Sequence, residues 1–305
     1  MAVCETESAI YPQVPPYNPP QVFPEYPFDS PIDIDNQVYA AVRDLLKKLG
    51  LDQGNFGKPH WDPFGCFINP GDTVLIKPNL VVDAYYLSKT DFQSAVTHGS
   101  IIRPIIDYTF LALNGKGKII VADGPIDLTD FHNATISNGL FQTIHYLKEG
   151  FSVPIELLDL RDERLKKISS IKLGKVELSA WIREKLSGDP LGYVTVDLKE
   201  DSEFEQIPDK YHYLRSTQLI RNKSEPKKHH QLGKHEYGIA KTVLDADVII
   251  SVPKLKAHKK TGNTINLKNT IGTIVPRYWM PHYMEGYDEY DDSIGIKHRI
   301  IKRLW

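Results

Sequence analysis

The sequence predicts an α/β protein with a doubly wound, mostly parallel Rossmann-like sheet, helices on both faces and an inserted charged subdomain. Apolar strands alternate with segments of helical spacing from about residue 36 to residue 160. The chain has 305 residues, 41% hydrophobic and 25% charged, which is enough for one large α/β domain. A charged stretch, residues 161–232, then interrupts the alternation, which resumes over residues 233–305.

Residues 1–35 are predicted to form an N-terminal arm. Prolines recur through this segment between aromatic residues, so it cannot be a helix or a central strand. Its aromatic content suggests that it lies on the body of the protein or on a second subunit, which allows a homo-oligomer. A disordered leader is the alternative.

The elements follow in order from hydrophobic periodicity and from capping and turn residues. Helices are expected after Asp35 and after Ser100, each ending near a glycine. The full set of expected segments is helices at 36–49, 100–113, 137–148 and 236–245, strands at 73–77, 118–122, 155–159 and 247–252, and short strands at 168–178 and 193–198. Residues 297–305 have helical spacing without a stop signal, so either the helix is cut short or the native chain is longer.

Composition limits the function classes. The net charge of −2 gives no general reason to expect nucleic-acid binding. The two cysteines, Cys4 and Cys66, are too few for an iron–sulfur cluster. No signal peptide and no apolar run of membrane-spanning length is visible, so a cytoplasmic protein without a membrane span is expected.

Polar residues follow three predicted strands where each strand ends. Lys77 and Asn79 follow the first strand, Asp123 follows the second, and Lys254 and its neighbours follow the last. Ligands of open parallel sheets bind outside the carboxyl ends of the strands. We therefore expect these residues to meet at one edge, with Lys77 and Asn79 binding an anion and Asp123 acting as a catalytic group; a turn role for Asp123 is the alternative.

The last of these segments is the most strongly cationic. Lys254, Lys256 and His258 follow a buried strand within five residues. We expect the lysines to bind an anionic substrate and His258 to be the acid–base group, although a solvated charge run would show the same composition. Asn263, Lys268 and Asn269, which come shortly afterwards, are expected to complete the binding site.

Two further histidine positions have alternative interpretations. His98 precedes a predicted helix, where it is either an acid–base group or a capping residue. His230 and His235 resemble a metal cluster in composition, but their spacing does not match the helical zinc pattern. The segment around His230 is predicted to be a solvated loop. No cofactor can be named, and a divalent metal remains an alternative.

These motifs together resemble the family named domain of unknown function 362. The resemblance covers about residues 70–276 and is carried by the segments 74–81, 97–98, 119–125, 246–258, 261–262 and 267–269. Many members of that family carry a ferredoxin-like cluster domain. This chain lacks the cysteines for one, so it resembles the cluster-free members.

A more distant similarity is to the nickel-pincer lactate racemase family. His258, Gly262 and Lys268 stand in the same order as that family's acid–base histidine, glycine and cofactor-bearing lysine. The run before Lys268 lacks the family's glycines, so the similarity does not extend to cofactor attachment there.

The sequence therefore predicts an enzyme that acts on a small phosphorylated or carboxylated substrate. A sugar derivative is one option within that class. A non-catalytic anion-binding module and a metal-dependent or racemase-like enzyme are the alternatives.

Overall fold

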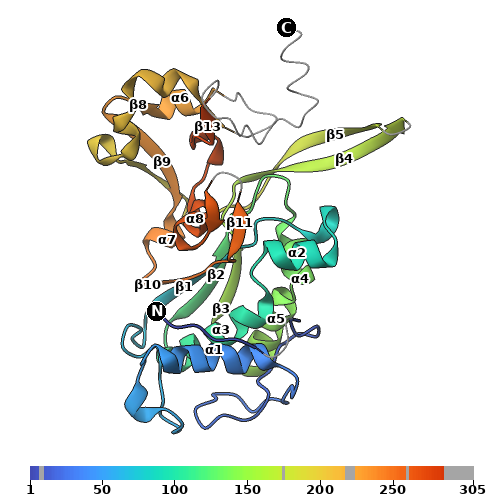
Figure 1. Ribbon diagram of the computed structural model, residues 1–305, viewed down its shortest axis with the longest axis vertical. Helices are drawn as coiled ribbons and strands as arrows, with labels where there is room; N and C mark the ends of the chain where they lie inside the picture. The colour runs from blue at the N-terminus through green and yellow to red at the C-terminus, as the bar shows by residue number, and fades with distance from the viewer. Residues whose placement is uncertain (7–9, 174–175, 217–223, 259–260, 285–305) are drawn as a thin grey trace. The chain divides into compact units, whose positions relative to one another are not determined.

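The computed structural model describes residues 1–6, 10–173, 176–216, 224–258 and 261–284 (Figure 1). Internal contacts divide the chain into two compact units. Unit 1 contains Met1–Asp159, Asp245–Lys254 and Ile265–Gly272, and unit 2 contains Leu160–Leu244, Leu255–Thr264 and Thr273–Trp305.

Unit 1 is built on a four-stranded parallel sheet. Its strands stand in the order β10 (Val248–Val252), β1 (Thr73–Pro78), β2 (Lys118–Asp123) and β3 (Ile155–Asp159). β1 and β2 are buried along almost their whole length, as parallel strands covered on both faces require. The predicted α/β class with a central parallel sheet is therefore confirmed.

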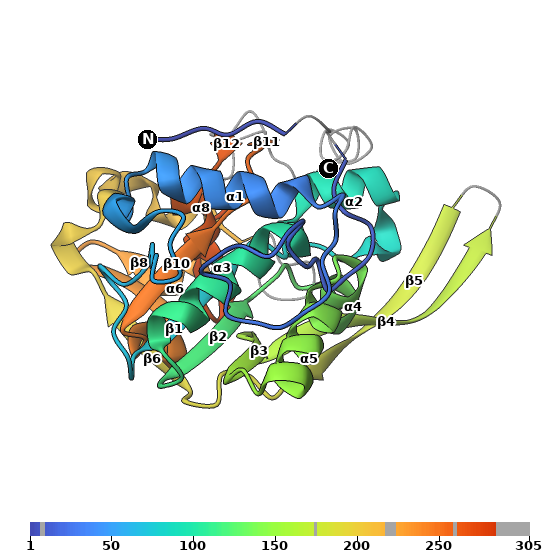
Figure 2. The ribbon, with the colours of Figure 1, turned by 90° about the horizontal axis from the view of Figure 1, so that it is seen from below.

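Helices flank this sheet. α3 packs on β1 and β2, α5 packs on β3, and α1 packs against α3 (Figure 2). The helices of unit 1 are α1 (Gln37–Lys48), α2 (Lys89–Ala95), α3 (Gly99–Leu113), α4 (Phe131–Ser137), α5 (Leu140–Phe151) and α8 (Asn266–Asn269).

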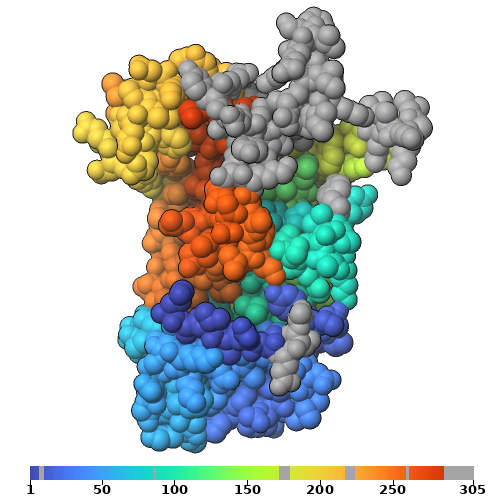
Figure 3. Space-filling model, in the orientation of Figure 1, coloured from blue at the N-terminus to red at the C-terminus, as the bar shows by residue number. Residues whose placement is uncertain are grey.

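The proline-rich arm lies against unit 1. The first residues of the chain form a strip on the surface of this unit, dark blue in the space-filling view (Figure 3). Further along the arm Tyr17, Phe23 and Phe28 are all buried. The arm therefore contributes apolar side chains to the folded unit.

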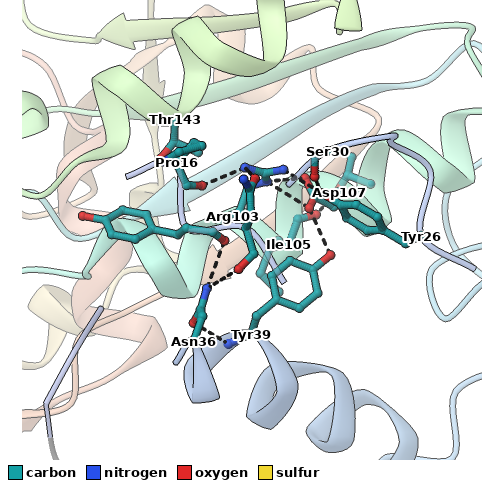
Figure 4. A network of polar contacts seen from close by, with 12 residues as sticks. Pro16, Tyr26, Ser30, Asn36, Tyr39, Arg103, Ile105, Asp107 and Thr143 are labelled. Atoms are coloured by element: carbon teal, nitrogen blue, oxygen red, sulfur yellow. Dashed lines mark hydrogen bonds and ion pairs between the residues drawn. The ribbon is translucent and has the colours of Figure 1, made fainter. Parts of the chain in front are cut away.

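A buried polar network fastens the arm to α3 (Figure 4). The Arg103 guanidinium pairs with the Asp107 carboxylate one helical turn later, with Nε 2.8 Å from Oδ1. Its other nitrogens donate to the carbonyl of Pro16 at 2.7 Å and to the Tyr26 hydroxyl at 2.9 Å. Tyr39 of α1 donates to Asp107 at 3.0 Å. One guanidinium thus joins α3 to the arm.

A second arginine fixes the arm further along. Arg43 of α1 makes a bidentate ion pair with Glu25, in which Nε donates to Oε1 at 2.6 Å and Nη2 donates to Oε2 at 3.1 Å. Its guanidinium also lies over the rings of Phe23, Phe56 and Trp61, between 4.4 and 5.0 Å from their centroids. Ion pairing and cation–π contact together compensate the burial of this charge.

Unit 2 consists of antiparallel pairs. β6 (Tyr193–Asp197), β9 (Lys234–Ala240) and β8 (His230–Gln231) form one sheet in that order, and β4 (Glu163–Leu173) and β5 (Val176–Lys185) form a long hairpin. Two short strand pairs follow: β7 (Leu214–Arg215) with β13 (Tyr283–Met284), and β11 (Lys256–His258) with β12 (Gly262–Thr264). The short helices of this unit are α6 (Pro226–His229) and α7 (Lys241–Leu244). That residues 161–232 form a charged subdomain inserted into the α/β domain remains a prediction.

Several expected elements differ from the structure. The helix predicted at 236–245 is wrong, because β9 pairs with β6 through residue 240 and only α7 follows. Pairing with a strand distant in sequence overrode the local helical spacing. α2 was not predicted; it begins after Ser88, whose hydroxyl caps it. The predicted helix at 297–305 lies outside the described residues.

None of the helices in the described part of the chain has both the length and the apolar character needed to cross a membrane.

Replacing Asp107 by asparagine should lower the free energy of unfolding by about 3–5 kcal/mol, because it leaves the buried Arg103 charge without its carboxylate. Denaturant unfolding measures the change. Glu156→Gln is the control, since it breaks the solvent-exposed pair with Lys118 and should cost under about 1 kcal/mol. Equal effects for the two variants would contradict the proposed importance of the network.

Candidate functional site

The carboxyl ends of three neighbouring strands of unit 1 lie at one edge of the sheet. β10, β1 and β2 run parallel, and their register places Lys77 beside Ser251 and Pro78 beside Val252. Asp123 is the last residue of β2. The structure thus brings the predicted residues of β1 and β2 together because both strands end at the same level.

Lys77 and Asp123 form a buried ion pair. Lys77 Nζ lies 2.6 Å from Asp123 Oδ1, and only 3% and 4% of the two side chains is exposed. The ammonium also donates to the carbonyl of Pro78 at 2.8 Å and approaches Asn269 Oδ1 at 3.4 Å. The other carboxylate oxygen accepts the backbone N–H of Leu80 at 2.6 Å. Protein groups therefore surround both charges.

Asn269 of α8 connects this pair to a third strand. Its amide nitrogen donates to the carbonyl of Lys77 at 2.7 Å and to the Ser251 hydroxyl at 3.0 Å. Gly272 lies so close that a Cβ there would collide with the Asp123 carboxylate and come within 2.7 Å of Lys77 Nζ. α8 and the turn after it are thus fitted closely onto the ion pair.

This arrangement bears on the roles predicted for Lys77, Asp123 and Asn269. The three N–H groups of Lys77 face three protein acceptors, so this geometry favours a positioning role over direct contact with a substrate anion. Asp123 and Asn269 are engaged in the same network. Binding and catalysis by these residues stay predictions.

Asn79 and Thr97 make further hydrogen bonds at this edge of the sheet. Thr97 Oγ1 accepts the N–H of Asn79 at 3.0 Å and donates to the carbonyl of Val252 at 2.7 Å. The Asn79 amide donates to the carbonyl of Ala95 at 3.1 Å. These bonds tie β1 and β10 to the segment that leads into α3.

His98 is the N-cap of α3. Its Nδ1 accepts the backbone N–H of Ser100 at 3.3 Å, so in the neutral ring the hydrogen resides on Nε2. Burial lowers the pKa of His98 to about 4, and the positive charges of Lys254 and Lys89 lower it in the same direction. No described residue is hydrogen-bonded to Nε2. The His98 ring is thus neutral, carries an Nε2–H donor, and lies in the positive field of Lys254 and Lys89.

Tyr11 of the arm covers His98. The two rings stack with centroids 4.4 Å apart and planes inclined by 8°. Lys254, which follows β10, donates from Nζ to the Tyr11 hydroxyl at 2.9 Å and lies 4.9 Å from the centre of the ring. Sequence reasoning missed Tyr11 as a site residue; the aromatic content of the arm was the only signal for it.

The remaining predicted residues fall in both units. Lys256, His258 and Asn263 belong to the β11–β12 hairpin of unit 2, in which His258 Nδ1 accepts the N–H of Thr261 at 3.3 Å. Lys268 lies in α8 of unit 1 and is half-buried. The structure thus assigns the cationic segment that begins at Lys254 to two different units.

His230 and His235 lie in unit 2 and are fully buried. The predicted solvated loop around His230 is therefore wrong, because β8 pairs with β9 and places the two histidines opposite each other. Their Nδ1 atoms are 3.3 Å apart. Within the described residues, no group of three or more His, Cys, Asp or Glu side chains could hold a metal ion.

Comparison with known families covers the motif segments that lie after residue 193. Residues 193–302 match the family model described as "Domain of unknown function (DUF362)". The match supports the predicted family resemblance over this region. No curated protein and no solved structure matches the chain. The similarity to the lactate racemase family stays a prediction.

Replacing Gly272 by alanine should lower the free energy of unfolding by about 1–3 kcal/mol, because the added methyl group displaces the Lys77–Asp123 pair. Thermal or denaturant unfolding measures the loss. Gly150→Ala in α5 is the matched control, since no atom lies within 4 Å of its Cβ position, and it should be neutral or stabilising by about 0.5–1 kcal/mol. A Gly272→Ala protein as stable as this control would rule out the tight fit.

The stability of the protein should depend on pH through His98. The folded pKa of about 4 lies below the ordinary value of 6.5, so the unfolded chain takes up a proton first as the pH falls. Stability is retained above pH 6.5 and is lost between that value and about pH 4, by about 3 kcal/mol in total. His98→Asn keeps a good helix cap and should remove this part of the loss. Unfolding curves at pH 7, 5.5 and 4 test this; equal pH dependence in both proteins would refute it.

Proposed function

We propose that the chain is an enzyme that acts on a small anionic substrate, phosphorylated or carboxylated, bound at the carboxyl edge of the unit 1 sheet. The observation that carries the proposal is the pairing of a cation with a neutral donor at this edge. Lys254 supplies the ammonium group, and His98 supplies an Nε2–H that no described residue uses.

The electrostatics of His98 support an anion as the ligand. Burial disfavours protonation of the His98 ring most, and the charges of Lys254 and Lys89 disfavour it further. Their positive field is offset when an anion binds beside the neutral imidazole. Donors held in place in a poorly hydrated site can also stabilise negative charge that develops during a reaction.

The buried ion pair supports the location. We infer that unit 1 is a doubly wound Rossmann-like domain, in which ligands bind outside the carboxyl ends of the strands. In this proposal Lys77, Asp123 and Asn269 hold the ends of β1, β2 and β10 in position, and Lys254 and His98 contact the substrate. Tyr11 would act as a cover over the bound molecule.

Residues of the hairpin in unit 2 extend the proposal on sequence grounds. We assign acid–base catalysis to His258 and further anion contacts to Lys256 and Asn263. Lys268 of α8 is assigned a substrate contact on the same grounds. The neutral His258 ring carries its hydrogen on Nε2, since Nδ1 accepts from Thr261, and this leaves Nε2–H as its donor.

Inorganic phosphate should bind to unit 1 and shift the imidazole NMR signals of His98. Lys254→Met should weaken the apparent affinity about tenfold, because it removes the charge and keeps most of the side-chain volume. Lys58→Met, at an exposed lysine bound to the carbonyl of Gly54, is the control and should bind as the wild type does.

The binding should also weaken as salt is added, since exposed charges are screened. Unchanged phosphate affinity in Lys254→Met would overturn the assignment of the anion site. Phosphorylated and carboxylated sugars can then be tested for turnover with the same proteins. Binding that depends on Lys254 with no turnover of any of these compounds would favour a non-catalytic anion-binding module and would overturn the enzymatic part of the proposal.

A further inference from the structure

Two histidines of unit 2 face each other in the interior. His230 of β8 and His235 of β9 are directly opposite in the antiparallel register, and both side chains are fully buried. Their Nδ1 atoms lie 3.3 Å apart. If both nitrogens carried only lone pairs, the contact would be repulsive, so it requires a proton on one of them.

The outer nitrogen of each ring faces an acceptor. His230 Nε2 lies 3.1 Å from the backbone carbonyl of Trp279, which can only accept a hydrogen bond. His235 Nε2 lies 3.3 Å from Glu205 Oε1 in an ion-pair contact that is poorly aligned as a hydrogen bond. The same oxygen accepts the N–H of Gly233, so it is an acceptor here. Both Nε2 atoms therefore need a hydrogen.

The count of hydrogens decides the charge. Three contacts are favourable only when a ring nitrogen carries a hydrogen: the hydrogen bonds of His230 with Trp279 and of the two Nδ1 atoms with each other, and the ion-pair contact of His235 with Glu205. Two neutral imidazoles carry only two N–H groups between them. A pair with all three contacts satisfied therefore carries three N–H groups and one positive charge.

The surroundings are suited to such a charge. The Glu205 carboxylate supplies a counter-charge on the His235 side. Aromatic rings enclose the pair: Phe204 lies 5.2 Å from His230, Tyr237 lies 5.1 Å from His230, and Tyr211 lies 5.6 Å from His235, measured between centroids. Aromatic faces attract a cation, and more strongly when water is excluded.

We propose that His230 and His235 share one proton between their Nδ1 atoms and form a singly charged, pH-responsive lock inside unit 2. The lock joins three segments that are distant in sequence: the β8–β9 hairpin, the 3-10 turn Glu203–Gln206 that carries Glu205, and the turn Arg277–Trp279. All of them lie within the region that matches the family model. The inference is independent of the proposed anion site in unit 1.

The pH response follows from the number of protons. Removing the shared proton leaves two lone pairs facing each other, and adding another proton creates two buried positive charges. Burial lowers the pKa of His230 to about 4, and the charge of His235 acts in the same direction. Both effects oppose the addition of a second proton to the pair. Among the described residues, titratable groups around the pair include Glu205, Tyr211, Tyr237, His229, Glu236 and Asp197.

Nitrogen-15 NMR of the full chain with labelled histidine tests the proposal at pH 7. We expect a hydrogen on Nε2 of both residues, and a third, shared hydrogen that places both Nδ1 shifts between those of imidazole and imidazolium. Glu205→Gln should abolish the shared hydrogen by removing the counter-charge. Glu203→Gln, an exposed position in the same turn, should leave it in place.

Two results would overturn the proposal. One is a neutral pair with only two N–H groups in the wild-type protein. The other is a stoichiometric metal ion bound by the two Nδ1 atoms in protein purified without an affinity tag. Because Glu205→Gln could disturb the fold, His229→Gln serves as a second comparison: it removes a neighbouring histidine that pairs with Glu236 and should keep the shared hydrogen.

Discussion

The buried ion pair between Lys77 and Asp123 is the interaction on which the architecture of unit 1 depends. Two charges with 3% and 4% of their side chains exposed are costly unless each is fully hydrogen-bonded. The pair meets this condition by recruiting the carbonyl of Pro78, the N–H of Leu80 and the amide of Asn269. Meeting that condition fixes the ends of β1, β2 and β10 and the position of α8 at the same time.

The hydrogen bonds made by these residues separate those that hold the sheet edge from those that we propose to bind the substrate. Lys77 has its donors occupied by protein groups, whereas Lys254 and His98 contact Tyr11 of the N-terminal arm. The arm is held further along by Arg103 and Arg43, whose charges are paired with Asp107 and Glu25. Tyr11 therefore lies over His98 on an arm whose later residues are fixed to unit 1.

The meeting of polar residues at the edge of the sheet could be predicted because the carboxyl ends of parallel strands lie at the same edge. Apolar runs that end in Lys77 and Asp123 indicated two strands whose polar ends would meet, and the structure places these side chains 2.6 Å apart. The helix predicted at 236–245 was wrong because a long-range partner, β6, pairs with that segment. The burial of His230 was hidden by the charged residues beside it in sequence, since alternation within a short strand gives a weak signal.

The sequence by itself determined the α/β class and the strands of the parallel sheet, because these depend on local periodicity, and it indicated the family whose model matches residues 193–302. Only the tertiary structure decided which polar groups are enclosed by partners. Lys77 and Lys254 look alike as strand-end lysines, but Lys77 pairs with the buried Asp123 carboxylate, whereas Lys254 donates to the Tyr11 hydroxyl and lies against its ring. The pairing of His230 with His235 likewise appears only when β8 and β9 fold together. Burial and the number of available donors and acceptors are properties of the assembled chain, and they distinguish residues that the sequence cannot tell apart.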